Sequence, residues 1–350
     1  MSQDPLPLIL FDPHPRSRGM LFDDRQWQRL SAAARIVGDG EGRLSAGIVE
    51  RHIAEAVLVI GQTDLQAERL ARAERLRAVI NVEGNFLPNV DYGECFARGV
   101  QVLSIAPAFA LPVAEMALAL ALDLTRGVTM ADRAFREGRE GYGLAGNRVA
   151  RLLTGSSIGM IGFGNLGRAL LPLLQPFRPT VRVFDPWLPD GYLREAGVEP
   201  TGLDAVLKQS TTVFVLAGVT TENHGMIGER ELALMPDGAA LVLMSRAGVV
   251  DWQAFTAAAA GGRIRAATDV FPQEPVAADD PVRQNPNLLL SAHRAGGMVE
   301  VFRRIGEMVV DDALLILADL PPVRLQAARR ETVGRLRSPP GRSYEKDEMK

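Results

Sequence analysis

Three ionisable side chains in the C-terminal half of the chain could together assist the reduction of a carbonyl group by a hydride donor. Arg246, Glu274 and His293 each follow an apolar run of β-like composition. Taken singly, an arginine or a glutamate after a strand is usually a solvated loop residue, and a lone histidine more often caps a strand than catalyses. The carboxyl ends of parallel strands meet at one edge of a sheet, so we expect the three side chains to share one crevice.

The chemistry of a 2-keto acid suits these three residue types. A guanidinium such as that of Arg246 can hold a carboxylate through two hydrogen bonds and polarise the neighbouring ketone. His293 can give a proton to the ketone oxygen, because imidazole changes charge near neutral pH. A carboxylate such as that of Glu274 beside it favours the imidazolium and fixes its tautomer. Oxidation of a hydroxy acid would run the same steps backwards, with neutral His293 accepting the proton.

A glycine-rich turn could bind the hydride donor that this reaction needs. Residues 159–167 hold the pattern G-x-G-x-x-G, with a strand-like run before it and a helical run after it. In such turns Gly162 permits the tight bend, Gly164 lets the backbone approach a pyrophosphate, and Gly167 lets helix and strand pack closely. The helix N-terminus presents N–H groups and a positive dipole end to the phosphates. The turn therefore predicts a dinucleotide site.

Asp185 decides which dinucleotide we expect. It follows the next strand-like run, 181–184, where a carboxylate hydrogen-bonds the adenosine ribose and repels a 2′-phosphate. NAD is therefore predicted over NADP. Enzymes that use S-adenosylmethionine also combine a glycine turn with a following acid, so the turn alone leaves that alternative open. Further cofactor contacts are expected from Asn165, Leu166, Ala217, Gly218, Thr220, Ser245 and Gly296.

Alternating strand-like and helical patterns must position these residues. The alternation predicts an α/β protein with parallel sheets, in two successive series. The six strands of the second series fit a doubly wound sheet. A long helix, 113–126, is expected to connect the series and to pack closely through Ala114, Ala117 and Ala121. The predicted strands are 6–11, 35–37, 57–60, 78–82 and 100–105 in the first series, and 157–161, 181–184, 211–216, 239–244, 265–268 and 287–291 in the second.

Composition excludes several other kinds of protein. With 350 residues the chain is long enough for two domains, and its 47% hydrophobic and 23% charged residues indicate a folded globular protein. A formal net charge of −3 gives no electrostatic reason to expect nucleic acid or an anionic membrane as partner. We expect no signal peptide, and the apolar segment 113–124 is interrupted by acids, so no membrane span is expected. The single cysteine, Cys95, favours a reducing, cytoplasmic setting, and no metal site is expected.

Three motifs around the candidate residues resemble those of the D-isomer-specific 2-hydroxyacid dehydrogenase family. Residues 242–251 resemble its N-x-A-R-G-x-x-V-D motif, residues 269–275 its D-V-F-x-x-E-P motif, and residues 287–296 its T-P-H motif. They occur in the family's order and follow the glycine turn. The resemblance extends clearly from about residue 79 to residue 320.

The resemblance implies roles for individual residues. It puts Arg246 on the family's catalytic arginine, Glu274 on its partner acid and His293 on its proton donor. Asp269 falls on the aspartate that the family places near the nicotinamide carboxamide. Residues 84–89 resemble the family's G-x-G-x-D-N substrate loop. This implies a substrate site formed by Gly84, Asn85, Phe86 and Arg246.

The resemblance also implies an architecture. Two Rossmann-like domains with parallel sheets are expected, with a nucleotide-binding domain, 106–297, inserted into a flavodoxin-like substrate domain made of 1–105 and 298–323. A homodimer built around the inter-domain helix is implied as well. The polar residues 324–350 are expected to form a flexible tail.

Departures from the family motifs limit what can be said of the substrate. Ser291 and Ala292 stand where the family has T-P, and Met298 stands where a threonine follows the histidine. In the loop that resembles the substrate loop, Glu83 and Phe86 indicate an unusual pocket. The reaction type is therefore expected to hold, while the identity of the hydroxy acid stays open.

We therefore predict an NAD-dependent oxidoreductase that interconverts a small 2-keto acid and a D-2-hydroxy acid, in the manner of a glyoxylate or hydroxypyruvate reductase. Its partner would be that small molecule. One alternative is an NAD(H)-sensing binding protein or co-repressor on the same fold, although such a protein need not keep all three reactive residues. The other is an enzyme similar to phosphoglycerate dehydrogenase, which the absence of an added regulatory domain makes less favoured.

Overall fold

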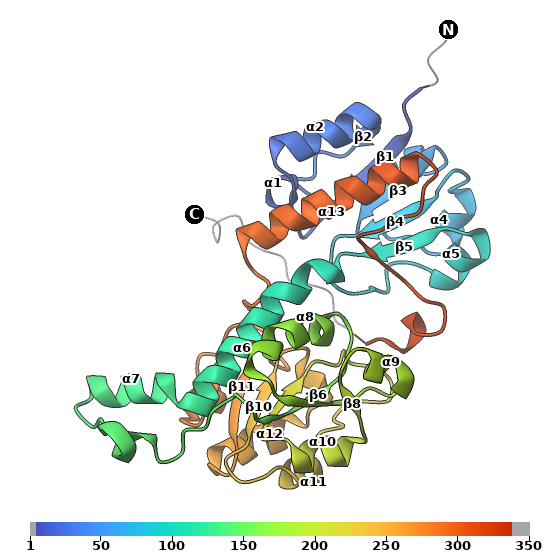
Figure 1. Cartoon of the computed structure of the whole chain (residues 1–350). Coiled ribbons are helices and arrows are strands. Elements are labelled where there is room, and N and C mark those ends of the chain that lie inside the picture. Colours follow the sequence, from blue (N-terminus) through green and yellow to red (C-terminus); the bar gives the residue numbers. More distant parts are fainter. Residues whose placement is uncertain (1–4, 338–350) are drawn as a thin grey trace. The chain divides into compact units, whose positions relative to one another are not determined.

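The computed structural model describes residues 5–337 of the chain. They fold as two compact units (Figure 1). Unit 1 combines the residues up to Phe109 with those from Gly297 onward, and unit 2 comprises Ala110–Gly296. Each unit is built on a parallel or mainly parallel sheet, so the predicted α/β fold class is confirmed.

The sheet of unit 1 has the strand order β13-β5-β4-β3-β1-β2. Its pairings are parallel except that of β13 with β5, which is antiparallel. The strands are β1 (Leu8–Asp12), β2 (Arg35–Val37), β3 (Ala56–Gly61), β4 (Ala78–Asn81), β5 (Gln101–Ser104) and β13 (Gln326–Ala327). The helices are α1 (Arg18–Leu21), α2 (Asp24–Ala33), α3 (Ala46–His52), α4 (Ala67–Arg72), α5 (Tyr92–Arg98) and α13 (Val299–Leu317).

Both faces of this sheet are covered by helices. Successive side chains of a strand point to opposite faces, so Ile9 of β1 packs in one cluster with α2 and α13, and Leu10 packs in another with α3, α4 and α5. A strand covered on both sides must be apolar throughout, and β3 is buried along its whole length. This is why the first-series strands are short continuous apolar runs in the sequence.

The C-terminal segment corrects one expectation. Residues 324–350 were expected to be a flexible tail, but β13 pairs with β5, and the chain continues to a 3-10 helix, η6 (Val333–Arg335). The cause is Asp312 of α13, which is fully buried and accepts the backbone N–H groups of Val323, Arg324 and Leu325 at 2.7–3.1 Å. Residues 338–350 lie outside the described part of the chain.

The sheet of unit 2 has the order β12-β11-β10-β9-β6-β7-β8 and is parallel throughout. The six predicted strands are present, together with the two-residue β8 that was not predicted. The order reverses between β6 and β9, and ligands of doubly wound sheets bind at such a switch point. The strands are β6 (Ser157–Ile161), β7 (Thr180–Phe184), β8 (Glu199–Pro200), β9 (Thr212–Val215), β10 (Ala240–Leu243), β11 (Arg265–Thr268) and β12 (Leu288–Leu290). The helices are α6 (Ala110–Arg126), α7 (Val128–Arg136), α8 (Asn165–Leu174), α9 (Asp190–Glu195), α10 (Leu203–Gln209), α11 (Glu229–Ala233) and α12 (Trp252–Ala260).

Helix α6 packs as a core helix of unit 2. The segment Ala106–Arg126 is long and apolar enough to cross a membrane by length and composition alone. Its small residues Ala114, Ala117 and Ala121 are at most 1% exposed and lie in the apolar cluster that contains α8 and the sheet. The predicted close packing of these alanines is confirmed, and it accounts for the apolar composition.

Candidate active site

The glycine turn joins β6 to α8 at the switch point of the unit 2 sheet. Gly162 has φ +93°, and a Cβ there would lie 2.6 Å from the backbone nitrogen of Ala217, so only glycine fits. A Cβ on Gly167 would lie 3.0 Å from the carbonyl oxygen of Gly162. A Cβ on Gly164 would meet nothing within 4 Å, and Gly164 precedes α8 without a side-chain cap.

This arrangement fits a pyrophosphate. Helix α8 begins at Asn165, and no side chain caps its N-terminus. The first backbone N–H groups of a helix commonly bind anions. The open space at Gly164 is on the same turn. Asn165 and Leu166 are the first two residues of α8, where the predicted contacts place them. When bound, NAD supplies or accepts the hydride of the reaction.

Asp185 follows β7 and lies against the glycine turn. Its Oδ2 accepts the backbone N–H of Phe163 at 2.7 Å, and its Oδ1 accepts that of Trp187 at 3.0 Å. A carboxylate offers about four acceptor positions, so these two bonds leave capacity for ribose hydroxyls. The bond to Phe163 was not predicted, and it fixes the acid beside the turn.

The loop after β9 is held by a residue that the sequence did not single out. Asn223 accepts the N–H of Thr220 at 2.7 Å and donates to the carbonyl oxygen of Gly218, also at 2.7 Å. Thr220 Oγ1 in turn accepts the N–H of Glu222 at 3.2 Å. Asparagine side chains commonly hold turns in this way, so the run Thr-Thr-Glu-Asn after a strand was the available signal.

His293 and Glu274 form a direct pair. His293 Nδ1 lies 2.7 Å from Glu274 Oε2, and Glu274 Oε1 accepts the N–H of Phe271 at 2.9 Å. The Glu274 side chain is 14% exposed and that of His293 is 41% exposed. The carboxylate therefore fixes the ring through Nδ1 and leaves Nε2 as the atom that can exchange a proton with a ligand.

The backbone of His293 is also unusual. Its φ of +50° lies in the left-handed region, which few non-glycine residues adopt. Asp269, which is 1% exposed, accepts the N–H groups of Arg294 and Ala295, each at 3.0 Å. These bonds hold the turn that follows His293. Strained backbone of this kind persists where the surroundings fix it, and it gathers at functional sites.

Arg246 follows β10, and the three candidate catalytic residues therefore follow neighbouring strands. Glu274 follows β11 and His293 follows β12, and β10, β11 and β12 are adjacent in the sheet. Arg246 is half-buried and donates to the carbonyl oxygen of Ser245 at 2.7 Å. Ser245 is buried, its hydroxyl donates to Val215 at 3.3 Å, and it thereby joins the ends of β10 and β9.

The residues of the expected substrate loop follow β4 in unit 1. Among residues 5–337, the backbone N–H groups of Gly84 and Phe86 form no hydrogen bond with a protein acceptor. The Phe86 ring packs edge-on against Tyr92, with centroids 6.3 Å apart. The loop thus offers backbone donors of the kind that hold a carboxylate. Gly296, a predicted cofactor contact, is the last residue of unit 2.

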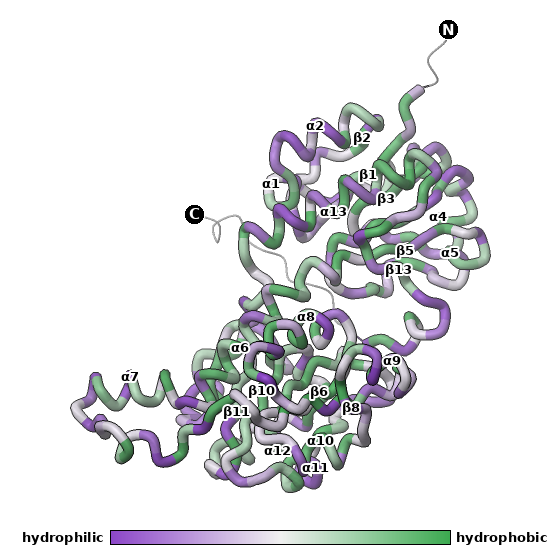
Figure 2. Tube along the Cα trace, in the orientation of Figure 1, coloured by the Kyte–Doolittle hydropathy of each residue, from purple (hydrophilic) through white to green (hydrophobic). Residues whose placement is uncertain are grey.

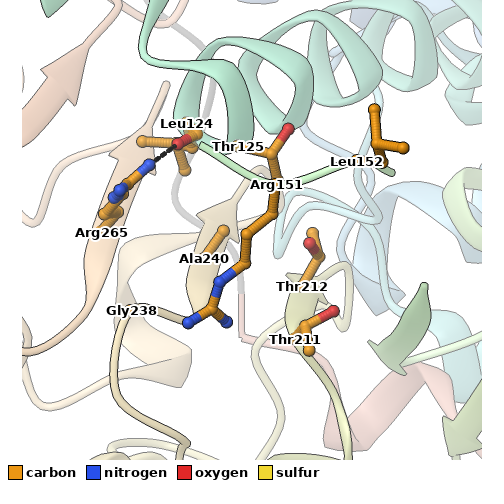
Figure 3. Close-up of a pocket in the computed structure, with 9 residues that line it drawn as sticks. All are labelled: Leu124, Thr125, Arg151, Leu152, Thr211, Thr212, Gly238, Ala240 and Arg265. Atoms are coloured by element: carbon orange, nitrogen blue, oxygen red, sulfur yellow. Dashed lines mark hydrogen bonds between the residues drawn. The ribbon is translucent and has the colours of Figure 1, made fainter. Parts of the chain in front are cut away.

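A small cavity in unit 2 is not part of this site. Figure 3 shows its lining at the amino ends of β9, β10 and β11, the opposite edge of the sheet. Its volume of about 10 Å³ would hold one water molecule. Arg265 there donates to the carbonyl oxygens of Leu124 and Val149, and burial together with nearby Arg151 lowers its pKa. The cavity thus lies beside the C-terminal end of α6, where Arg265 bonds to Leu124 and the backbone N–H of Arg151 bonds to Thr125.

A doubly wound sheet with a glycine turn, an acid held against that turn and an acid–histidine pair after its strands is the arrangement of a nicotinamide-dinucleotide-dependent dehydrogenase. Residues 118–295 match the family model of the D-isomer specific 2-hydroxyacid dehydrogenase, NAD binding domain. The chain belongs to this family. It is an NAD-dependent oxidoreductase that acts on the CH–OH group of 2-hydroxy acids.

Relatives with curated names agree with this assignment. The chain is 32% identical to the glyoxylate reductase of Korarchaeum cryptofilum over 281 residues, 79% of this chain and 84% of that protein. It is 29% identical to the D-3-phosphoglycerate dehydrogenase of Archaeoglobus fulgidus over 269 residues, 76% of this chain. The match spans only 50% of that dehydrogenase. A phosphoglycerate oxidoreductase from Rhizobium etli has a solved structure with a TM-score of 0.84 and 45% identity, covering 93% of this chain and all of that one.

Proposed function

We propose that this protein reduces a small 2-keto acid, such as glyoxylate or hydroxypyruvate, to the D-2-hydroxy acid with NADH. The observation that carries the proposal is the contact of His293 Nδ1 with Glu274 Oε2 at 2.7 Å. The pair is built like a general acid held by a carboxylate, with Nε2 left for the substrate.

Each residue has one task in the proposed reaction. Arg246 holds the substrate carboxylate and draws electron density from the ketone. In unit 1, the N–H groups of Gly84 and Phe86 are proposed to bind a substrate carboxylate, because their loop resembles the family's substrate loop. His293 gives its Nε2 proton to the ketone oxygen as the carbonyl is reduced, and Glu274 stabilises the imidazolium before that transfer. In oxidation His293 takes the proton back.

The relatives support this class of substrate and leave a second candidate. The Korarchaeum glyoxylate reductase is matched over 84% of its length, whereas the Archaeoglobus phosphoglycerate dehydrogenase is matched over half. The Rhizobium protein, described as a phosphoglycerate oxidoreductase, is matched over its full length. A phosphorylated substrate is therefore the second candidate.

The proposal is tested with purified protein, NADH and a panel of 2-keto acids, followed by loss of absorbance of NADH. We expect turnover of glyoxylate or hydroxypyruvate, and a fall in kcat of about 10²- to 10⁴-fold in His293→Ala. His52→Ala, which changes a histidine of α3 in unit 1, is the matched control and should keep full activity. Intact NADH binding without turnover of any 2-keto acid would contradict the proposal and favour an NAD(H)-sensing protein.

We also propose that the protein is a homodimer. The residues from α7 to residue 152 form an arm that extends from the rest of unit 2 (Figure 1), and no residue of α7 is buried. Figure 2 shows hydrophobic and hydrophilic stretches alternating along this arm. Phe135 is 62% exposed, Tyr142 75% and Leu144 87%. An apolar surface of this kind marks an interface, and a second copy of the chain is the occupant that the family resemblance implies.

Light scattering after size exclusion tests the dimer. We expect the mass of two chains for the wild type, and a shift toward one chain in Phe135→Glu/Leu144→Glu. Glu137→Ala, at an exposed charged position on the same arm, should leave the mass unchanged. A wild-type protein that ran as a single chain at micromolar concentration would contradict this proposal.

A reducing, cytoplasmic setting is proposed on the chemistry of the single cysteine. Cys95 is buried and forms no disulfide. Proteins of oxidising compartments commonly rely on disulfides, and this chain cannot form one internally. Fractionation of the producing cells would test the setting, and recovery of the protein outside the cytoplasm would contradict it.

A further inference from the structure

A buried ion pair adjoins the loop that we propose binds the substrate carboxylate. Arg16 Nε lies 3.2 Å from Glu83 Oε1, and Arg16 Nη2 donates to Glu83 Oε2 at 3.4 Å. The two side chains are only 6% and 5% exposed. Glu83 directly precedes Gly84, so the pair lies at the start of the loop.

A third residue fixes the position of this pair. The guanidinium of Arg16 stacks over the ring of Phe302, with its Cζ 4.7 Å from the ring centroid. Arg16 comes from the segment between β1 and α1, Glu83 from the segment after β4, and Phe302 from α13, all within unit 1. Ser104 holds the backbone of Glu83 by donating to its carbonyl oxygen at 3.3 Å. The carboxylate and the guanidinium are therefore held against each other.

This arrangement leaves Arg16 with no unmatched positive charge to offer to a phosphorylated substrate. A phosphate group carries a second and third negative charge and is usually bound by guanidinium or ammonium groups whose charge is not already matched. The positive charge of Arg16 is matched by Glu83 at 3.2 Å. In a poorly solvated site the carboxylate of Glu83 also repels a further anion.

Two further charged side chains, Asp12 and Arg43, belong to segments near this pair. Asp12, at the end of β1, is 2% exposed and accepts the N–H of Leu44 and the hydroxyl of Thr63. Arg43 donates to the carbonyl oxygen of Gln62. Among these four side chains, the negative charges of Asp12 and Glu83 balance the positive charges of Arg16 and Arg43.

We propose that Glu83, acting through Arg16, selects 2-keto acids whose only negative charge is the carboxylate and disfavours phosphorylated ones. Glu83 is a positioning residue in this proposal, because it acts on the substrate through the charge of Arg16. The inference rests on the proposed function, in which the loop of Gly84 and Phe86 holds the carboxylate. By this inference the protein acts on substrates such as hydroxypyruvate in preference to their phosphate esters.

The first test compares hydroxypyruvate with its 3-phosphate ester on the wild-type enzyme. We expect kcat/KM to favour hydroxypyruvate by about 100-fold, the size of effect that juxtaposed like charges produce. Equal turnover of the two, or a preference for the phosphate ester, would overturn this inference and leave the proposed function intact. Turnover of neither would overturn the proposed function, and the inference with it.

The second test removes the negative charge alone. Glu83→Gln keeps the shape and one acceptor oxygen, so we expect KM for the phosphate ester to fall about tenfold while kcat for hydroxypyruvate stays within a few fold. The matched control, Arg16→Gln/Glu83→Gln, has neither charge and should show no gain. A gain of the same size in the control would show that charge is not the cause and would overturn the assignment to Glu83. Thermal unfolding of each variant shows whether it is folded, and if Glu83→Gln is not, the wild-type comparison decides alone.

Discussion

The Asp185 carboxylate accepts the backbone N–H of Phe163 at 2.7 Å, so the acid that predicts NAD also closes the glycine turn. The same group therefore has two tasks. We expect it to accept the hydroxyls of the adenosine ribose, and it holds the glycine turn through the N–H of Phe163. These tasks respond differently to substitution.

The variants Asp185→Asn and Asp185→Ala separate the effect of Asp185 on cofactor preference from its effect on the glycine turn. Asn keeps an acceptor for Phe163 but removes the charge, so we expect the preference for NADH over NADPH to fall about tenfold. Ala removes the acceptor as well and should weaken both cofactors about tenfold or more. Fluorescence titration measures the Kd values, with Asp190→Asn at the exposed start of α9 as control. An Ala variant that bound NADPH better than the Asn variant would show that the contact with Phe163 does not shape the turn.

Glu274→Gln tests how the carboxylate acts on His293. The amide cannot stabilise an imidazolium by charge, so we expect kcat of reduction to fall at least about tenfold with the Kd for NADH unchanged. Gln273→Ala, at the exposed position before it, should be silent. Because the two residues would act as one unit, Glu274→Gln/His293→Ala should be no slower than His293→Ala alone. Fully multiplied losses in the double variant would mean that the residues work separately.

Asp311 makes the stability of unit 1 depend on pH. Burial raises the pKa of this carboxyl, but the hydrogen-bonded guanidinium groups of Arg29 and Arg324 outweigh burial and lower it below the ordinary 3.8. A lowered folded-state pKa contributes stability above the unfolded value, and this stability is lost as the pH falls through the folded value. We expect Asp311→Asn to reduce the free energy of unfolding by about 1 kcal/mol near pH 7, since the site is partly solvated.

Urea unfolding at several pH values measures this contribution. The difference between wild type and Asp311→Asn should shrink as the pH is lowered past 3.8. Glu41→Gln, at an exposed position of unit 1, is the control. A difference that stayed constant across the range would show that Asp311 stabilises by packing and not by charge.

Cys95 should be inert in the folded protein. Burial, with smaller contributions from Asp91 and Glu94, raises the pKa of its thiol to about 12. Only the thiolate is nucleophilic, so alkylation with iodoacetamide at pH 8 should be negligible until the protein unfolds. Mass spectrometry with and without urea checks this, the unfolded chain serving as its own control. Rapid labelling of the native protein would mean that α5 opens readily.

Local patterns were sufficient to predict the strands, the glycine turn and the placement of Arg246, Glu274 and His293 after neighbouring strands. Each depends on residues close in sequence or on the rule that parallel strands present their carboxyl ends at one edge. The antiparallel pairing of β13 could not be predicted in this way, because it depends on Asp312, a buried acid in an otherwise ordinary amphipathic helix.

The contact partners of individual side chains could not be predicted from the sequence either. Glu83 was noted as unusual for the loop, but its contact with Arg16 joins residues 67 positions apart. Asp269 was expected near the nicotinamide, and the structure adds its bonds to Arg294 and Ala295. Such contacts depend on which loops the fold brings together, and no local periodicity encodes that.

The division of unit 1 between the two ends of the chain has a consequence for synthesis. Unit 2 is continuous from Ala110 to Gly296, so all of it is synthesised before α13. The face of the unit 1 sheet that includes Ile9 and Leu58 packs against Val309 and other residues of α13. During translation that face is covered only in part, by α1 and α2, until α13 has been made. The nascent N-terminal segment therefore exposes apolar surface of the kind that chaperones shield.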